Sequence, residues 1–269
     1  MKSSELRFGL IGHPIAGSGS PALFARAYGG RWPYDLIDNE DFESCWREFL
    51  SSFHAINITA PFKEKAFRRV LECGRVDSEC EPVGAINIAV KTPEGIVGYN
   101  SDYLGVKRVL LEEGFGTKPV CKVSQNQGHL TRFTRESVQG VQESGTPCTP
   151  LAIVVGFGGA GKAAAAAARS LGMEVVVCNR SRYTPEIRPL EDIPVLAPVA
   201  DILIYTLSFP LPILTAGEAV LPGTVLEANY RTPCLENYGG RYIHGRRWLE
   251  AQAVEGYPLM TGLPCKLPL

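Results

Sequence analysis

The sequence lacks an excess of charge of either sign. Its 27 Lys and Arg residues nearly balance 28 Asp and Glu residues, so the formal net charge is −1. Without a basic excess there is no broad field to attract nucleic acid and no polybasic anchor for a membrane surface. We therefore expect neither nucleic acid nor membrane as a partner.

Long apolar runs are also missing. No uninterrupted stretch reaches the roughly 18 residues that a membrane-spanning helix needs, because the run at residues 163–168 is closed by Arg169. The first five residues are polar, and the apolar run at 8–11 is too short for the core of a signal peptide. These features predict a cytoplasmic protein.

The cysteines show no C-x-x-C pair, and only Cys73 and Cys80 lie close together. Scattered spacing without a secretion signal predicts free thiols in a reducing compartment. With only four histidines, no metal site is expected. The eight cysteines are Cys45, Cys73, Cys80, Cys121, Cys148, Cys178, Cys234 and Cys265.

The chain has 269 residues, of which 45% are hydrophobic and 20% charged, as in an ordinary globular protein of about two domains. Over residues 1–103, short strand patterns alternate with helical patterns. We expect strands at 7–11, 34–37 and 55–59, and helices at 21–28, 42–53 and 63–71. This alternation predicts an α/β domain with a parallel or mostly parallel sheet covered by helices.

A polar, poorly periodic segment at 121–149 is interpreted as an insertion. A second α/β pattern begins at Leu151, with strands expected at 151–155, 174–178, 202–206 and 224–228 and an alanine-rich helix at 162–171. Four prolines within 181–200 argue against a full crossover helix there. A closing helix is expected at 246–255. We predict one domain from residues 1–103 plus 240–269, and a second from 104–239.

A glycine-rich turn joins the strand at 151–155 to the helix that follows it. Its sequence G-F-G-G-A-G fits the dinucleotide pattern G-x-G-x-x-G, and the strand–turn–helix context is the correct one. The glycines allow a tight turn, close approach of a pyrophosphate and close helix packing, although a purely structural turn is the alternative. The predicted cofactor residues of this Rossmann-like domain are Gly156, Gly158, Gly159, Ala160 and Gly161.

The end of the next strand indicates which dinucleotide is bound. An NAD site carries an acid there for the ribose 2′-hydroxyl, but this chain has Asn179, Arg180 and Ser181. A guanidinium can pair bidentately with a 2′-phosphate. The three residues therefore favour NADP as the cofactor, with a solvated basic turn as the alternative.

Polar side chains recur where strands of the first domain end. Asn57 and Thr59 alternate with isoleucines on one strand, and Lys63 follows at once. Ser18 and Ser20 precede a helix, where capping by Ser20 would explain one serine but not both. In open α/β sheets such junctions line the ligand crevice.

Two further segments add to this set. Asn87 follows a tight turn, and Asp102 precedes a helix, where a helix cap is the plain alternative. Hydroxyls and amides in number suit a polyhydroxylated ligand. A Lys and an Asp beside a nicotinamide suit proton transfer to an alcohol or ketone.

The motifs G-H-P-I-A-G-S-G-S-P, N-I-T-A-P-F-K, G-A-I-N and N-S-D, in this order, resemble the shikimate dehydrogenase family. The turn G-F-G-G-A-G followed by N-R-S is similar to the same family. The resemblance covers nearly the whole chain apart from 121–149. It implies reversible reduction of 3-dehydroshikimate to shikimate with NADPH, on the path to chorismate and the aromatic amino acids.

The resemblance also implies residue roles. Lys63 and Asp102 would be catalytic, with Lys63 exchanging a proton with the reacting oxygen. Ser18 and Ser20 would hold the substrate carboxylate. The other implied substrate-binding residues are Asn57, Thr59, Asn87, Tyr230 and Gln252.

Departures from the family pattern leave alternatives open. Trp248 replaces a Met of the family's closing helix and is expected to crowd the nicotinamide. Quinate or an amino analogue could replace shikimate as substrate, or the chain could be a catalytically silent metabolite-binding protein. A monomer and a homodimer are both compatible with the sequence.

Overall fold

The computed structural model describes residues 6–116, 149–181, 184–215 and 220–267. Apart from Thr149, the predicted insertion at 121–149 lies outside the described residues. The chain divides into two compact units. The first comprises Met1–Val109, Gly158–Ala167 and His244–Leu269, and the second comprises Leu110–Phe157 and Ala168–Ile243.

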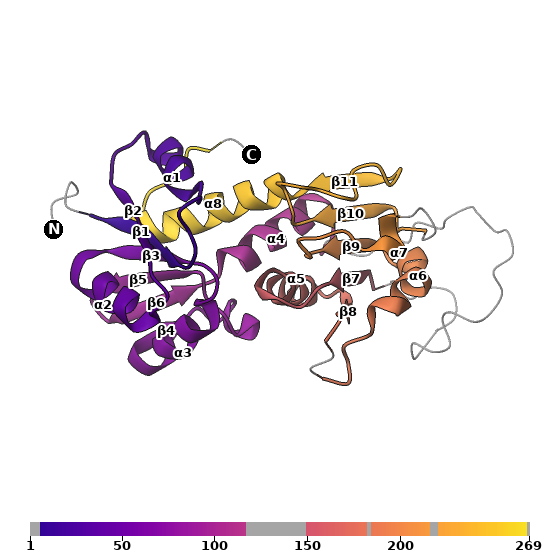
Figure 1. Ribbon diagram of the computed structural model, residues 1–269, viewed down its shortest axis with the longest axis horizontal. Coiled ribbons are helices and arrows are strands. Elements are labelled where there is room, and N and C mark those ends of the chain that lie inside the picture. The colour runs from indigo at the N-terminus through magenta and orange to yellow at the C-terminus, as the bar shows by residue number, and fades with distance from the viewer. Residues whose placement is uncertain (1–5, 117–148, 182–183, 216–219, 268–269) are drawn as a thin grey trace, which may run out of the picture. The chain divides into compact units, whose positions relative to one another are not determined.

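The first unit is a sheet covered by helices (Figure 1). Its strands are β1 (Phe8–Gly12), β2 (Tyr34–Asp38), β3 (Ala55–Ile58), β4 (Gly74–Val76), β5 (Ile88–Thr92) and β6 (Gly95–Tyr99). Its helices are α1 (Ser20–Tyr28), α2 (Phe42–Ser52), α3 (Lys63–Cys73), the short η1 (Glu81–Val83), α4 (Ser101–Glu112), which ends in the second unit, and α8 (Gly245–Thr261). The strands and helices predicted within residues 1–103 are confirmed to within two residues at their ends.

The six strands lie in the order β2-β1-β3-β5-β6-β4. Only β5 runs antiparallel to its neighbours, so the prediction of a mostly parallel sheet is confirmed. The β5–β6 hairpin was not predicted. Its turn ends at Gly95, whose φ of 126° is a conformation that glycine adopts without steric cost.

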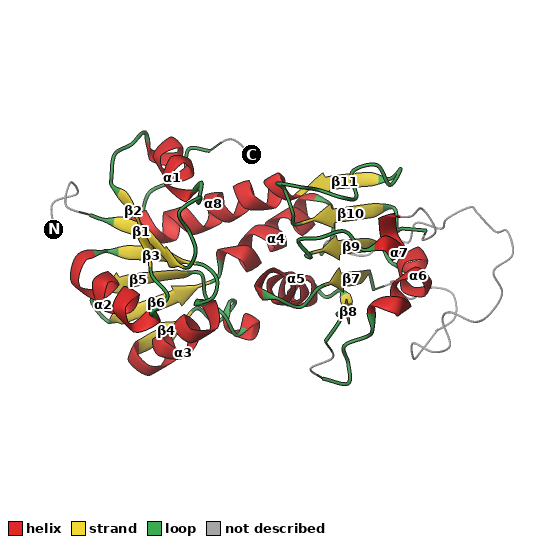
Figure 2. Cartoon of the chain, viewed as in Figure 1, coloured by secondary structure: helices red, strands yellow, loops and turns green. Residues whose placement is uncertain are grey.

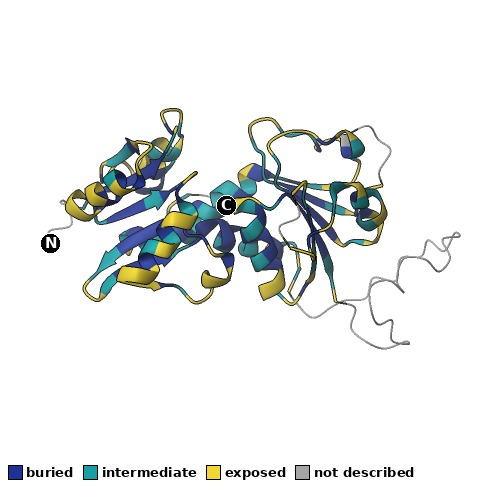
Figure 3. Ribbon diagram, turned by 60° about the horizontal axis from the view of Figure 1, so that its bottom comes forward, coloured by how far each residue is buried: buried dark blue, intermediate teal, exposed yellow. Residues whose placement is uncertain are grey.

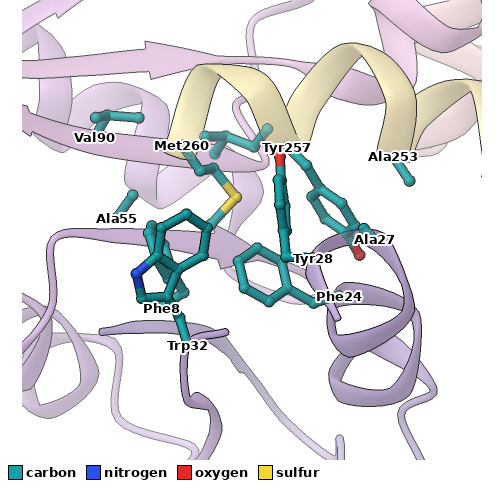
Figure 4. Close-up of a cluster of buried hydrophobic side chains, with 11 residues drawn as sticks. Phe8, Phe24, Ala27, Tyr28, Trp32, Ala55, Val90, Ala253, Tyr257 and Met260 are labelled. Carbon is teal, nitrogen blue, oxygen red and sulfur yellow. The ribbon is translucent and has the colours of Figure 1, made fainter. Parts of the chain in front are cut away.

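One face of this sheet packs against α1 and α8 through a cluster rich in aromatic rings (Figure 4). Phe24 lies at its centre, with its ring centroid 5.1 Å from those of both Phe8 and Tyr257. The closing helix α8 continues past its predicted end at residue 255 and through Pro258. Met260, near its end, is also buried in this cluster. Burial of Tyr257 and Met260 keeps the last turns helical despite the proline.

The opposite face is covered by α2 and α3. Asp41 begins α2, because its carboxylate accepts hydrogen bonds from the amides of Glu43 and Ser44 at 3.1 Å each. Phe42, Trp46 and Phe49 then recur at helical spacing and are buried. Strands of both sheets are largely buried, as Figure 3 shows.

The second unit carries a sheet in the order β11-β10-β9-β7-β8. The strands β7 to β10 pair in parallel. The strands are β7 (Leu151–Val155), β8 (Glu174–Cys178), β9 (Ile202–Tyr205), β10 (Thr224–Glu227) and β11 (Arg241–His244). After β7 comes α5 (Gly159–Ser170), most of which belongs to the first unit. The helices that follow β8 and β9 are η2 (Leu190–Asp192), α6 (Ile193–Leu196), η3 (Ala197–Val199) and α7 (Pro212–Thr215).

The shortened crossover between β8 and β9 is confirmed. In the described part of this connection, only short helical segments occur (Figure 2), and Ile193 and Ala197 from them enter the core of the second unit. Before them, the chain pairs once with the edge strand. The amide of Arg188 donates to the Val177 carbonyl at 2.8 Å, and the amide of Asn179 donates to the Arg188 carbonyl at 3.0 Å.

Within the described ranges, no helix is long and apolar enough to cross a membrane. Six cysteines there are free thiols, whereas Cys121 and Cys148 lie outside the described residues. Burial raises the pKa of the Cys80 and Cys178 thiols to about 12. Both thiols are therefore weak nucleophiles at neutral pH.

Glu227, at the end of β10, is a buried carboxylate that organises the loop after it. It accepts hydrogen bonds from the amides of Cys234 and Leu235 at 2.8 and 3.1 Å. The Tyr242 hydroxyl donates to the same carboxylate at 2.8 Å. Burial, followed by the contact with Glu227, raises the pKa of the Cys234 thiol to about 12. The carboxylate thus fixes both ends of the loop that carries Tyr230.

The substitution Glu227→Ala is expected to lower the free energy of unfolding by about 2–4 kcal/mol, because it leaves several buried or partly buried donors without an acceptor. Chemical denaturation of the variant measures this loss. Glu191→Ala, at an exposed position of η2, is the control and should change stability by less than about 0.5 kcal/mol. Equal effects of the two substitutions would contradict the anchoring role.

Candidate active site

Lys63 and Asp102 meet in the first unit. Lys63 is the first residue of α3 and Asp102 the second residue of α4. The Lys63 Nζ lies 2.5 Å from Asp102 Oδ2, and the two side chains are 23% and 9% exposed. The motifs N-I-T-A-P-F-K and N-S-D thus place a cation and an anion, Lys63 and Asp102, in direct contact although the two residues are 39 positions apart.

Asp102 is available for this contact because another residue caps α4. The side-chain oxygen of Asn100 accepts from the Tyr103 amide at 2.9 Å, and its amide nitrogen donates to the Ala85 carbonyl at 2.8 Å. The helix-cap alternative for Asp102 is therefore not supported. Sequence reasoning missed Asn100, although it stands in the N-S-D motif two residues before the aspartate.

Trp248 of α8 holds the start of α4 from the other side. Its indole Nε1 donates to the Asp102 backbone oxygen at 2.9 Å, and its side chain is 2% exposed. This buried hydrogen bond fixes the backbone that carries the carboxylate. From the sequence, Trp248 was a departure expected to crowd the nicotinamide, whereas the structure buries its ring within the first unit.

The amides of Asn57 and Asn87 are tied into one network. The Asn57 Nδ2 donates to the Asn87 backbone oxygen at 3.3 Å, and the Tyr34 hydroxyl donates to Asn57 Oδ1 at 2.8 Å. Asn87 Oδ1 accepts from the backbone amide of Ser101 at 2.6 Å and from its hydroxyl at 3.2 Å. Neither Tyr34 nor Ser101 was singled out from the sequence.

The two serines lie together before α1. Ser18 Oγ donates to Ser20 Oγ at 3.0 Å and accepts from the Ser20 amide at 3.2 Å. The interpretation of Ser20 as a helix cap is wrong, because Ser20 is the first residue of α1 and Gly19, which has no side chain, holds the cap position. Both hydroxyls are partly exposed, so a ligand can reach them.

Asp38, at the end of β2, anchors the loop that leads to these serines. Its Oδ2 accepts from the Ile15 amide at 3.0 Å, and its Oδ1 lies 2.8 Å from His13 Nδ1. The Ile15 hydrogen bond first, and then His13, lower the pKa of the Asp38 carboxyl below its usual 3.8. The ionised carboxylate is therefore the form that the folded loop favours.

The other predicted substrate residues have more varied surroundings. Thr59 is partly exposed just after β3. Gln252 lies on α8 against α4, where a Cβ on Gly105 would come within 2.7 Å of the Gln252 backbone nitrogen. Tyr230 belongs to the second unit, where the Arg231 guanidinium lies 5.8 Å from its ring.

The glycine turn has open space at the positions where a phosphate would approach. Gly156 has a φ of 95°, and a Cβ there would lie 2.6 Å from Thr206 Oγ1, so glycine is required. A Cβ on Gly158 would meet nothing within 4 Å. Gly158 and Gly159 are exposed at the start of α5, whereas Gly161 is buried within it. An exposed helix start of this kind suits an anion, so the turn fits a dinucleotide pyrophosphate.

The residues after β8 also fit a dinucleotide. β8 lies beside β7 in the sheet, with Val155 opposite Cys178. Asn179 and the glycine turn therefore follow the carboxyl ends of two neighbouring parallel strands. Asn179 Nδ2 donates to the Ser181 backbone oxygen at 2.8 Å, which shapes the bend. Arg180 and Ser181 are exposed, and the guanidinium is accessible to a phosphate.

No family model matches the chain. The chain is 29% identical over 181 residues to a shikimate dehydrogenase (NADP(+)) of Thermus thermophilus, covering 65% of the chain and 56% of that protein. It is 29% identical over 281 residues to a shikimate dehydrogenase (NADP(+)) of Natronomonas pharaonis, covering 95% of the chain and 93% of that protein. The chain is a homologue of the shikimate dehydrogenases. The match with the Thermus protein spans little more than half of that relative's length, and the match with the Natronomonas protein spans nearly all of it.

Structural comparison agrees with the sequences. The solved structure of shikimate 5-dehydrogenase from Thermus thermophilus, in complex with NADP(H) and shikimate, matches with a TM-score of 0.68 at 26% identity. The match covers 97% of this chain and 95% of that one. The resemblance seen in the motifs is thereby confirmed, as is the α/β fold with a Rossmann-like domain. The roles of the individual site residues stay predictions.

The hydrogen bonds of Asp38 predict that the stability of the protein depends on pH. A carboxyl whose pKa is depressed on folding contributes stability above its unfolded pKa, and this contribution is lost as the pH falls through the folded pKa. Wild-type protein should therefore be more stable than Asp38→Asn at neutral pH, and the difference should shrink as the pH falls below the ordinary value of 3.8.

Thermal unfolding of both proteins from pH 7 to pH 3 measures this difference. Glu94→Gln, on the exposed turn between β5 and β6, is the control and should follow the wild type throughout. A difference between wild type and Asp38→Asn that stays constant over this range would contradict the anchor.

Proposed function

We propose that this protein catalyses the NADP-dependent, reversible reduction of 3-dehydroshikimate to shikimate, in the biosynthesis of chorismate and the aromatic amino acids. The observation that carries the proposal is the 2.5 Å contact between Lys63 Nζ and Asp102 Oδ2, beside the linked amides of Asn57 and Asn87. The two homologues described above bear the name of this NADP-dependent activity.

Lys63 is the residue that exchanges a proton with the reacting oxygen of the substrate. Its ammonium is a compact donor, and it is held in place by a carboxylate that is 9% exposed. Asp102 accepts from Lys63 with one oxygen, and its carboxylate has further acceptor capacity for the substrate hydroxyl. In this arrangement, Asp102 orients the hydroxyl while Lys63 gives or takes the proton.

Substrate binding is assigned to the surrounding polar side chains. Ser18 and Ser20 offer two adjacent hydroxyls to the substrate carboxylate. The ring hydroxyls are assigned to Asn57, Thr59, Asn87 and Asp102. Tyr230 and Gln252 are the other substrate-binding residues. We assign residues 1–103 plus 240–269 to the substrate domain and residues 104–239 to the cofactor domain.

The cofactor residues are Gly156, Gly158, Gly159, Ala160 and Gly161 for the pyrophosphate, and Asn179, Arg180 and Ser181 for the 2′-phosphate. When bound, NADP supplies the group that accepts or donates the hydride. The open space in front of Gly158 and the exposure of Arg180 support this assignment.

One assay tests the whole proposal. Nicotinamide absorbance is followed with the purified protein, NADP or NAD, and a panel of shikimate, quinate and an amino analogue of shikimate. Fast turnover of shikimate with NADP is expected. Turnover of quinate or the amino analogue alone would redirect the assignment, and binding without turnover of any of them would favour a catalytically silent metabolite-binding protein.

Lys63→Ala is expected to lower kcat by about 10³-fold, within the usual range for general acid–base groups, and to weaken shikimate binding less than about tenfold. Lys63→Arg keeps the ion pair but carries a guanidinium that does not deprotonate in proteins, so kcat should fall while the fold is retained. Lys65→Ala, exposed two residues later on α3, is the matched control. Near-normal turnover by Lys63→Arg would refute the proton-transfer role.

Arg180→Ala is expected to raise the KM for NADPH by about 10- to 100-fold, because a charge-assisted contact with the 2′-phosphate is lost. The KM for NADH, which lacks this phosphate, should change little. Arg169→Ala, on the exposed last turn of α5, is the control. An equal rise for both cofactors would leave Arg180 without a role in choosing between them.

A further inference from the structure

Tyr34 reaches the candidate substrate site from the neighbouring strand. β2 and β3 flank β1 on its two sides, with Tyr34 and Ala55 both opposite Phe8. Because side chains alternate along a strand, Tyr34 and Asn57 share one face of the sheet. The Tyr34 ring is fixed by Phe24, whose centroid lies 4.9 Å away, and its hydroxyl meets Asn57 Oδ1 at 2.8 Å.

The orientation of the Asn57 amide follows from the backbone around it. The Asn57 Nδ2 faces the Asn87 backbone oxygen at 3.3 Å, and that oxygen also accepts from the Ile58 amide. A backbone carbonyl can only accept, so the amide nitrogen must face it. The amide oxygen must then face the Tyr34 hydroxyl.

The Tyr34 hydroxyl is a donor at physiological pH. Burial raises its pKa well above the usual value of 10, and a hydrogen bond with Ser20 opposes this rise only in part. The Tyr34 phenol therefore stays protonated, and its O–H donates a hydrogen bond to Asn57 Oδ1. Asn57 is partly exposed, and its amide carries a second N–H that can donate to a ligand.

The Asn87 amide has the same orientation, with its oxygen bonded to the protein. The backbone amide of Ser101 can only donate, so Asn87 Oδ1 faces it at 2.6 Å and the amide nitrogen is the group left for a ligand. Two neighbouring asparagines thus have their oxygens engaged inside the protein, and Asn57, which is partly exposed, has an N–H available to a ligand.

We infer that Tyr34 is a specificity-determining positioning residue, which fixes Asn57 with its N–H toward the substrate. The ligand atom at this position must then accept a hydrogen bond, as a hydroxyl or carboxylate oxygen does and an ammonium group does not. The inference rests on the proposed function, because it takes Asn57 to be a substrate-binding residue.

A double-mutant cycle tests the inference, with shikimate binding measured by calorimetry and turnover measured with NADP. Tyr34→Phe should weaken shikimate binding by about tenfold in the wild-type background, because one hydrogen bond that orients the amide is lost. In an Asn57→Ala background, the same substitution should cost less than about twofold, since the amide on which it acts is gone. A merely structural role of Tyr34 would give equal losses in both backgrounds, and that result overturns the inference.

A further variant tests whether residue 57 must donate a hydrogen bond to the ligand. Asn57→Asp keeps an acceptor for the Tyr34 hydroxyl but has no donor for the ligand, so it should bind shikimate as weakly as Asn57→Ala or more weakly. Wild-type affinity in Asn57→Asp would overturn the inference. Tyr28→Phe is the matched control, because its hydroxyl lies in the same aromatic cluster but bonds the Leu263 oxygen instead, and it should bind shikimate like the wild type.

The two proposals fail in different ways. Absence of shikimate turnover with NADP by the wild type overturns the proposed function, while the binding cycle still decides the role of Tyr34. Normal turnover with equal Tyr34→Phe losses in both backgrounds overturns only the inference. Absence of any shikimate binding by the wild type overturns both.

Discussion

The contact between the Lys63 ammonium and the Asp102 carboxylate is the constraint on which the first unit depends. Removing either charge from water costs several kcal/mol, so neither side chain is stable at its low exposure without the other. The contact therefore requires the first turns of α3 and α4 to face each other. The Asn100 cap and the Trp248 indole, each hydrogen-bonded to the first turn of α4, keep that geometry. The Lys63–Asp102 contact and the residues that hold α4 therefore depend on each other.

Hydrogen-bond polarity is determined by backbone groups throughout this site. Carbonyls that only accept, and amides that only donate, set the orientation of Asn57, Asn87 and Asn100. Side-chain amides are otherwise easily reversed, because their two ends have nearly the same shape. Since the oxygens are engaged inside the protein, the site offers N–H groups to an oxygen-rich ligand, in agreement with the polyhydroxylated substrate expected from the sequence.

Much of the fold could be predicted from the sequence, because most elements carry a clear period. The strand at 151–155 and the one at 174–178 were predicted at their observed bounds, since each is a short apolar run ended by a turn. The β5–β6 hairpin was missed because its strands carry neither a strict alternation nor an unbroken apolar run. Lys63 and Asp102 were chosen by motif, but their contact depends on pairing across the sheet. Tyr34 gave no signal, because an aromatic residue on a strand is ordinary until its neighbours are known.

The segment after β8 pairs with backbone groups at the border of its sheet. β8 is the last strand of its sheet, and an outermost strand presents unsatisfied backbone groups on which another chain can add a strand. The bridge from Arg188 occupies the Val177 carbonyl and the Asn179 amide at this border. The Arg188 bridge thus leaves fewer free backbone groups on β8 with which another chain could pair.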